Sequence, residues 1–166
     1  MAIVPQTVWA LLLLATAAGL VSGVFLTFSD FVMKSLAASR PSAGTEAMQI
    51  INRKVFRSIF MVLLIGLVPI SIVTAITGYF FFEGVLSALL IFAGMLYIIG
   101  VFLVTVAGNV PMNNTLEALP QGGVAAQKYW PSYVRGWLFW NHIRWIAALA
   151  VSVCYMVSAV LMVNAA

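Results

Sequence analysis

The side chains that could do chemistry lie where long apolar segments of the chain begin or end. Six of them could bind or react with a ligand: Asp30, Asn109, Asn113, Asn141, His142 and Arg144. An imidazole can remove a proton, and amide and guanidinium groups can stabilise the oxyanion that results. Ionisable groups at membrane depth are costly unless they are paired or face a cavity, which makes these residues functional candidates.

The spacing around the last of these segments suggests a pocket wall. On a helix, Trp137, Asn141, Arg144 and Ala148 share one stripe, so the amide and the guanidinium can point inward together. His142 is the only histidine, and its ordinary pKa lies near neutrality, so we expect it to be the general base. We therefore predict two groups of site residues, the catalytic His142, Arg144 and Asn141, and the substrate-binding Asp30, Asn109, Asn113 and Trp137.

Each of these residues also has an ordinary structural interpretation. Arg144 could bind lipid phosphate, Asp30 could pair with a basic neighbour, and His142 could be a hydrogen-bonded interfacial residue. The tryptophans near the last apolar segment could form an interfacial aromatic belt, with one or two stacking on a flat ligand.

The composition requires a lipid environment. Of 166 residues, 64% are hydrophobic and 7% charged, whereas soluble domains carry about 25% charged residues. Several uncharged runs exceed the length of about 18 residues that indicates a membrane span. We predict an all-α fold, a single domain over residues 1–166, that forms an up-down-up-down four-helix transmembrane bundle with spans at about 8–28, 59–78, 86–107 and 138–162.

The connections between these spans set the expected topology. A short aromatic turn at 78–84 predicts a tight hairpin, and Pro111 predicts that the third helix ends near Asn109. Seven of the eight basic residues fall between spans one and two or between spans three and four, and the eighth, Arg144, lies in the first turns of span four. The positive-inside rule then predicts an integral, multi-pass membrane protein with both termini on the non-cytoplasmic side.

Several classes of site have no signature in the sequence. One histidine and one cysteine, Cys154, do not form a metal-binding set, and there is no phosphate loop, paired CxxC or nucleophile elbow. No metal or cofactor is therefore assigned. The basic residues are explained by topology and anionic lipid, so the expected partner is the lipid bilayer and not nucleic acid.

Two motifs resemble those of the DUF1772 family, which includes the anthrone oxygenases. The first is Asn109-Val110-Pro111-Met112-Asn113, and the second is Trp130, Tyr133 and Trp137 followed by Asn141-His142-Ile143-Arg144. The resemblance extends over essentially the whole chain, including Gly23 to Asp30. It implies a small four-helix membrane protein and, for the fungal branch, oxidation of a tricyclic anthrone to an anthraquinone by dioxygen without an obvious cofactor.

Two functions from different classes follow. The first is an anthrone oxygenase-like protein that binds a planar, apolar, phenolic or quinone-like molecule at the cytoplasmic end of the bundle, with His142 as base and Asn141, Asn113 and Arg144 stabilising the oxyanion. The alternative is a non-catalytic accessory or structural subunit of a larger membrane complex, which would pack through the small residues Ala15, Gly19 and Gly23 or through an outer aromatic face. The small residues first indicate a close helix contact within the bundle. A transporter is less favoured, because the spans lack charged residues at mid-depth.

Overall fold

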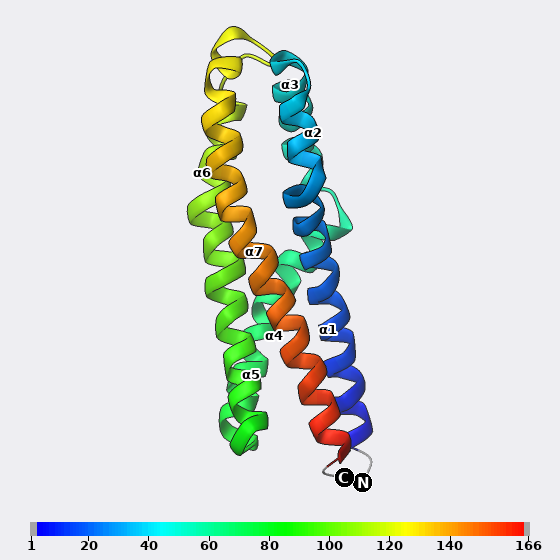
Figure 1. Ribbon diagram of the computed structural model, residues 1–166. Coiled ribbons are helices and arrows are strands. Elements are labelled where there is room, and N and C mark those ends of the chain that lie inside the picture. The colour runs from blue at the N-terminus through cyan, green and yellow to red at the C-terminus, as the bar shows by residue number, and fades with distance from the viewer. Residues whose placement is uncertain (1–2, 165–166) are drawn as a thin grey trace.

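In the computed structural model, which describes residues 3–164, every regular element is a helix (Figure 1). The first long rod consists of α1 (Ile3–Thr27), the π-helical segment η1 (Phe28–Val32) and α2 (Met33–Ala38). The second rod consists of α3 (Pro41–Val55) and α4 (Ile59–Phe81). The third rod is α5 (Gly84–Leu96), the π-helical segments η2 (Tyr97–Leu103) and η3 (Thr105–Asn109), and α6 (Val110–Glu117), and the fourth is α7 (Val124–Asn164).

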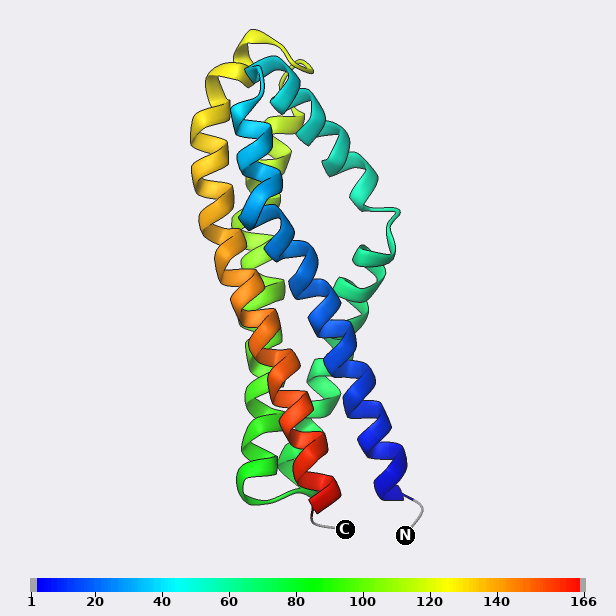
Figure 2. The ribbon, with the colours of Figure 1, turned by 45° about the vertical axis from the view of Figure 1, so that its right-hand side comes forward.

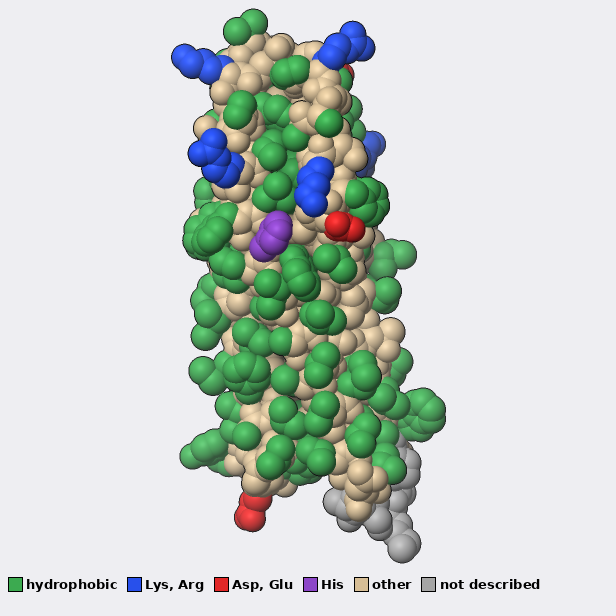
Figure 3. Space-filling model, in the orientation of Figure 1, with side chains coloured by type: hydrophobic (Ala, Val, Ile, Leu, Met, Phe, Trp, Pro, Cys, Tyr) green, Lys and Arg blue, Asp and Glu red, His purple; other side chains and the backbone are tan. Residues whose placement is uncertain are grey.

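Four of these rods are long and apolar enough to cross a membrane, which confirms the predicted all-α bundle and its membrane environment. All four are longer than the predicted spans, the one at Ile59–Phe81 only slightly. Helix α7 has 41 residues and is therefore about 61 Å long, twice the hydrocarbon thickness of about 30 Å. One end of the bundle, built from α2, α3, α6 and the first turns of α7, consequently extends beyond the hydrocarbon. Lys and Arg side chains gather there, and we refer to it as the basic end (Figure 3).

The expected end of the third helix at Asn109 is wrong. The chain passes from η3 directly into α6, with Pro111 in the first turn of α6. In a π-helical segment the backbone hydrogen-bond register shifts by one residue, and a proline just after it does not interrupt a regular ladder. The polar residues from Asn109 to Asn114 are thus carried on a continuous rod and not on a loop.

The membrane half of the core consists of tightly packed small and aliphatic residues. Ser152 Oγ of α7 donates to the Ala15 carbonyl oxygen at 2.7 Å, and a Cβ added to Gly19 would lie 3.3 Å from that hydroxyl. Two of the three small residues proposed as a subunit contact therefore serve packing between α1 and α7 inside the bundle. Gly23 has open space around its Cβ position.

The basic end has its own core and a polar clasp. Met33, Met48, Leu116, Trp130 and Tyr133 are buried together there. Helix α3 covers them with one face, since its buried residues recur every three or four positions: Gly44, Thr45, Met48, Gln49 and Asn52.

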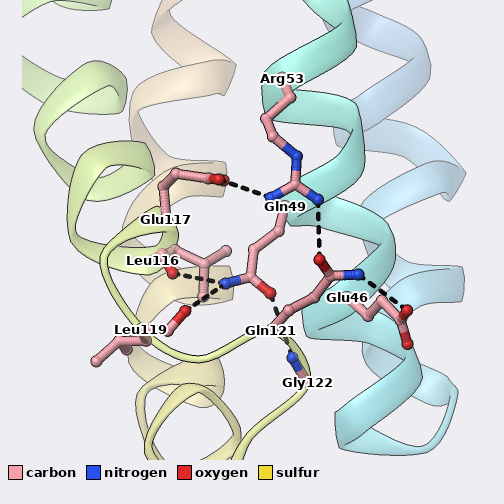
Figure 4. Close-up of polar contacts among 8 residues, drawn as sticks. All are labelled: Glu46, Gln49, Arg53, Leu116, Glu117, Leu119, Gln121 and Gly122. Carbon is pink, nitrogen blue, oxygen red and sulfur yellow. Dashed lines mark hydrogen bonds and ion pairs between the residues drawn. The ribbon is translucent and has the colours of Figure 1, made fainter.

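We use the name clasp for the contacts that tie α3 to α6 and the turn after it (Figure 4). Buried Gln49 donates to the carbonyl oxygens of Leu116 at 2.8 Å and Leu119 at 3.0 Å, and its Oε1 accepts from Gly122 N. At the surface Arg53 pairs with Glu117 at 2.7 Å. Between the clasp and α4 the chain bends at residues 56–58, and Ser58 caps α4 by accepting from Met61 N.

Candidate functional site

A cavity of about 370 Å³ lies between the four rods where the basic end meets the apolar half of the bundle. Its volume falls in the range of about 300–1,000 Å³ that is typical of small-molecule sites. Much of its wall is aromatic or aliphatic, including Phe25, Phe28, Phe56, Phe60 and Leu64. The polar part of the wall consists of Asn52, Arg53, Thr105, Asn109, Asn113, Asn114, Glu117 and Arg144.

The depth of the cavity follows from helix lengths. Arg144 lies 20 residues before Asn164, the end of α7, and 20 residues of α-helix span about 30 Å. Helix α4 begins at Ile59 and has 23 residues, so its start lies at a similar depth. If the opposite end of the bundle sits at one membrane face, Arg144 and the bend at 56–58 lie near the other edge of the hydrocarbon.

Arg144 is the central residue of this site. Its side chain is 5% exposed, and its Cζ lies 4.2 Å from the ring centroid of Phe25 and 5.2 Å from that of Trp137. Nη2 donates to Asn141 Oδ1 at 2.6 Å and Nη1 to Thr105 Oγ1 at 3.4 Å, whereas Nε has no partner. Among residues 3–164 the salt bridge between Arg53 and Glu117 is the only one, so no carboxylate neutralises the Arg144 charge. A buried cation on a cavity wall without a counter-ion favours an anionic ligand.

Asn141 holds this guanidinium in place and is itself outside the cavity. It is fully buried, and its Nδ2 donates to the Phe25 carbonyl oxygen and to Ser29 Oγ, both at 2.7 Å. Because a carbonyl oxygen can only accept, the orientation of the amide is fixed, with Oδ1 toward Arg144. Asn141 thus connects α1 to Arg144 and does not line the cavity, and its predicted catalytic role stays a prediction.

Three predicted binding residues do line the cavity: Asn109, Asn113 and Trp137. Asn109 Nδ2 donates to the Trp137 carbonyl oxygen at 3.1 Å, and Asn113 Oδ1 accepts from Trp137 Nε1 at 3.0 Å. Trp137 is therefore held on both sides by the rod that it faces. The predicted stripe on α7 is confirmed, since Trp137, Asn141, Arg144 and Ala148 are all buried.

Two π-helical segments adjoin the site. Segment η1 supplies Phe28 and Ser29, and η3 supplies Thr105 and Asn109. Such segments are frequent at functional sites, because the extra residue in a turn re-aims the side chains that follow it. The first and the third rod each contain such a segment, which explains how side chains from separate rods converge on Arg144.

The structure does not bring His142 or Asp30 into the cavity. The imidazole is exposed on the outer surface of α7, where Figure 3 shows the chain's single histidine. Its Nδ1 lies 2.6 Å from the Leu138 carbonyl oxygen, so this nitrogen donates and the basic Nε2 remains outside. Asp30 is exposed as well and does not line the cavity. Neither residue lines this cavity, and the predicted catalytic role of His142 and the predicted binding role of Asp30 stay predictions.

Sequence reasoning missed Phe25 and Thr105 because both lie inside apolar segments. Phe25 looks like any other lipid-facing or core residue, and nothing in the sequence indicates that its ring lies over a guanidinium. Thr105 is a lone hydroxyl near the end of a span, and its own proton goes to the Val101 carbonyl oxygen at 2.7 Å. This bond leaves the Thr105 oxygen free to accept from Arg144.

Comparison with known proteins agrees with this geometry. The family model described as anthrone oxygenase matches residues 56–154, which is more than half of the chain. The chain belongs to the anthrone oxygenase family. The matched segment contains Thr105, Asn109, Asn113, Trp137 and Arg144, whereas the walls contributed by α1 and α3 lie outside it. No curated protein and no solved structure matches the chain.

Proposed function

We propose that this anthrone oxygenase family member binds a planar aryl ketone of the anthrone type in the cavity and promotes its oxidation by dioxygen. The observation that carries the proposal is the buried, uncompensated charge of Arg144 on an otherwise largely apolar wall. A tricyclic ketone is apolar over its rings, and its anion carries negative charge on one oxygen. The rings suit the aromatic wall and the oxygen suits the guanidinium.

The reaction balances with dioxygen as the only co-reactant. Loss of one methylene proton from the anthrone gives an enolate whose oxygen is held by Arg144. The electron-rich ring carbon transfers electrons to dioxygen and forms a carbon–oxygen bond, which after protonation is a hydroperoxide. Cleavage of its O–O bond with loss of the second proton gives the ketone and water, so that anthrone plus O₂ yields anthraquinone plus H₂O.

Arg144 contributes by stabilising the anion relative to the neutral ketone. Preorganised donors in a site that excludes water are worth much more than the same donors in water, and typical losses on removal are about 10²–10³ in rate. Glu117 is the only carboxylate on the cavity wall, and it lies 12 residues beyond Thr105 and is paired with Arg53. In this proposal the methylene proton is accepted by water at the polar end of the cavity, near Asn114 and Glu117, and no side chain acts as a dedicated base. His142 has no role inside the cavity.

The membrane supplies the ligand in this proposal. By the positive-inside rule the basic end is cytoplasmic, so the cavity lies at the level of the inner leaflet. Figure 2 shows the bend between α3 and α4 standing away from α1, and the cavity is lined on that side by Val24, Phe28 and Phe56. Val24 and Phe56 are 37% and 70% exposed. An apolar ketone dissolved among the acyl chains would reach the cavity between these residues.

The test uses purified protein in lipid nanodiscs. Anthrone is first bound without oxygen and followed by the absorbance of its anion, and then oxygen is admitted and anthraquinone formation is compared with protein-free nanodiscs. Arg144→Gln should lose anion binding and at least about 100-fold of the catalysed rate. Arg135→Gln removes an exposed charge of the same helix and should behave as the wild type. Equal oxidation by Arg144→Gln and the wild type would refute the proposal.

A further inference from the structure

Asn113 presents an unused, directed hydrogen-bond donor to the cavity. Its Oδ1 accepts from both Tyr133 Oη at 2.8 Å and Trp137 Nε1 at 3.0 Å. An indole N–H can only donate, so the amide orientation is fixed and Nδ2 must point elsewhere. Nδ2 has no partner among residues 3–164, Asn113 is only half-buried, and it lines the cavity.

The position of Asn113 differs from that of Arg144. Trp137 separates the two, since its ring lies 5.2 Å from Arg144 Cζ while its Nε1 bonds to Asn113. Along the third rod Asn113 lies eight residues beyond Thr105, the residue that contacts Arg144, which is a rise of about 12 Å. One ligand oxygen therefore cannot serve both donors, and Asn113 is available for a second oxygen.

We infer that Asn113 is a specificity-determining residue, which selects planar ketones with a second oxygen, a ring hydroxyl or carbonyl, remote from the oxygen held by Arg144. This inference rests on the proposed function and adds to it the residue that distinguishes ligands by their second oxygen. The hydroxyl accepts from Asn113 Nδ2 and keeps its own proton free for water at the polar end. A ligand without this oxygen leaves a polar group of the wall without a partner, which lowers its affinity.

The experiment compares two probes in the absence of oxygen, so that binding is measured without turnover. Anthrone has one oxygen, and 3-methoxyanthrone has a second on an outer ring away from the ketone, which can accept a hydrogen bond but cannot donate one. The wild type should bind 3-methoxyanthrone roughly three- to tenfold more tightly, as expected for one added hydrogen bond. Asn113→Asp keeps oxygen acceptors for Tyr133 and Trp137 but removes the amide donor, and a carboxylate cannot bond to the methoxy oxygen, so it should abolish this preference.

The matched control is Asn114→Asp. It adds the same charge at the adjacent, exposed position on the cavity wall and should keep the preference. The ratio of the two affinities is the readout, because any general effect of charge or folding acts on both probes alike. Equal binding of the two probes by the wild type, or a preserved preference in Asn113→Asp, overturns the inference but leaves the proposed function standing if anthrone still binds. Failure of the wild type to bind either probe overturns both.

Discussion

Asn141 Oδ1 accepts a hydrogen bond of 2.6 Å from Arg144 Nη2, one turn along the same helix, and this contact fixes the direction of the only buried cation in the part of the chain that is described. The other side of the amide is bonded to the backbone and a hydroxyl of α1. The guanidinium is therefore held by a neutral group, which orients it without neutralising it. A carboxylate at position 141 would cancel its charge, and it would lose the bond to the Phe25 carbonyl oxygen because it has no donor.

The first prediction follows from that difference. Asn141→Asp should form an ion pair with Arg144 and lower the affinity for the anthrone anion by about tenfold or more, because the ligand then competes with an internal counter-ion. Binding measured without oxygen in nanodiscs checks this. Asn114→Asp places the same charge on the cavity wall away from Arg144 and should have a smaller effect. Unchanged anion affinity in Asn141→Asp would mean that the Arg144 charge does not bind the ligand.

A second prediction concerns stability. The free Arg144 charge is buried beside aromatic rings, and its replacement by an apolar side chain of similar length removes a desolvated ion. Arg144→Met should therefore stay within about 2 kcal/mol of the wild type, because relief of the desolvated charge is offset by the loss of cation–π contacts worth about 1 kcal/mol and by the buried Asn141 Oδ1 left without its donor. Thermal unfolding in detergent measures the change, and the same preparation should not oxidise anthrone. A large loss of stability would show that Arg144 is a structural residue.

The third prediction concerns His142. Its side chain lies on the outer surface of the bundle, so His142→Ala should change the rate of anthrone oxidation by less than about threefold, within the usual range for a surface residue. Turnover in nanodiscs across pH 5.5–8.5 is the measurement. Loss of activity in His142→Ala would instead support the general base that the sequence suggested, and would place the reacting carbon outside the cavity.

The sequence supports some parts of this site and not others, for identifiable physical reasons. The lengths of the apolar runs are enough to locate the four rods in the sequence. Asn109, Asn113 and Arg144 lie near the ends of those runs, which is enough to predict that these three residues lie at a similar depth. The α7 stripe in fact argued against His142, because adjacent residues on a helix are rotated by about 100° and Asn141 already faced inward. The continuation through Pro111 depends on a π-helical register, which has no signature in composition or spacing.

The clasp provides a fourth prediction, on the energetics of the basic end. Gln49 satisfies three backbone groups at once, and Gln49→Leu would leave the Leu116 carbonyl oxygen without a partner in a buried place and the other two groups without one in partly buried places. At about 1–3 kcal/mol for a buried unsatisfied group, and less for the partly buried ones, we expect a loss of about 2 kcal/mol or more in the free energy of unfolding. Glu46→Gln alters an exposed member of the clasp and should cost less than about 0.5 kcal/mol. Equal effects would contradict the view that the buried amide, and not the surface charges, holds α3 onto α6.

The last prediction concerns the route into the cavity. Val24 on α1 and Phe56 at the bend after α3 both line the cavity and are exposed, and the proposed function places them at the depth of the inner acyl chains. If the ligand passes between them, joining Val24→Cys to Phe56→Cys with a cleavable bifunctional thiol reagent should slow the binding of anthrone at least tenfold, because a link across the opening blocks a planar molecule. Cleavage of the link should restore the rate.

The native Cys154 is replaced by Ala in all proteins compared, and thiol reagents of increasing length are used to span the distance between the two introduced cysteines. A link between Leu20→Cys and Ile65→Cys, both exposed and neither on the cavity wall, is the control. Binding that is as fast in the Val24–Phe56 linked protein as before linking would show that the ligand arrives through the polar end, past Asn114 and Glu117.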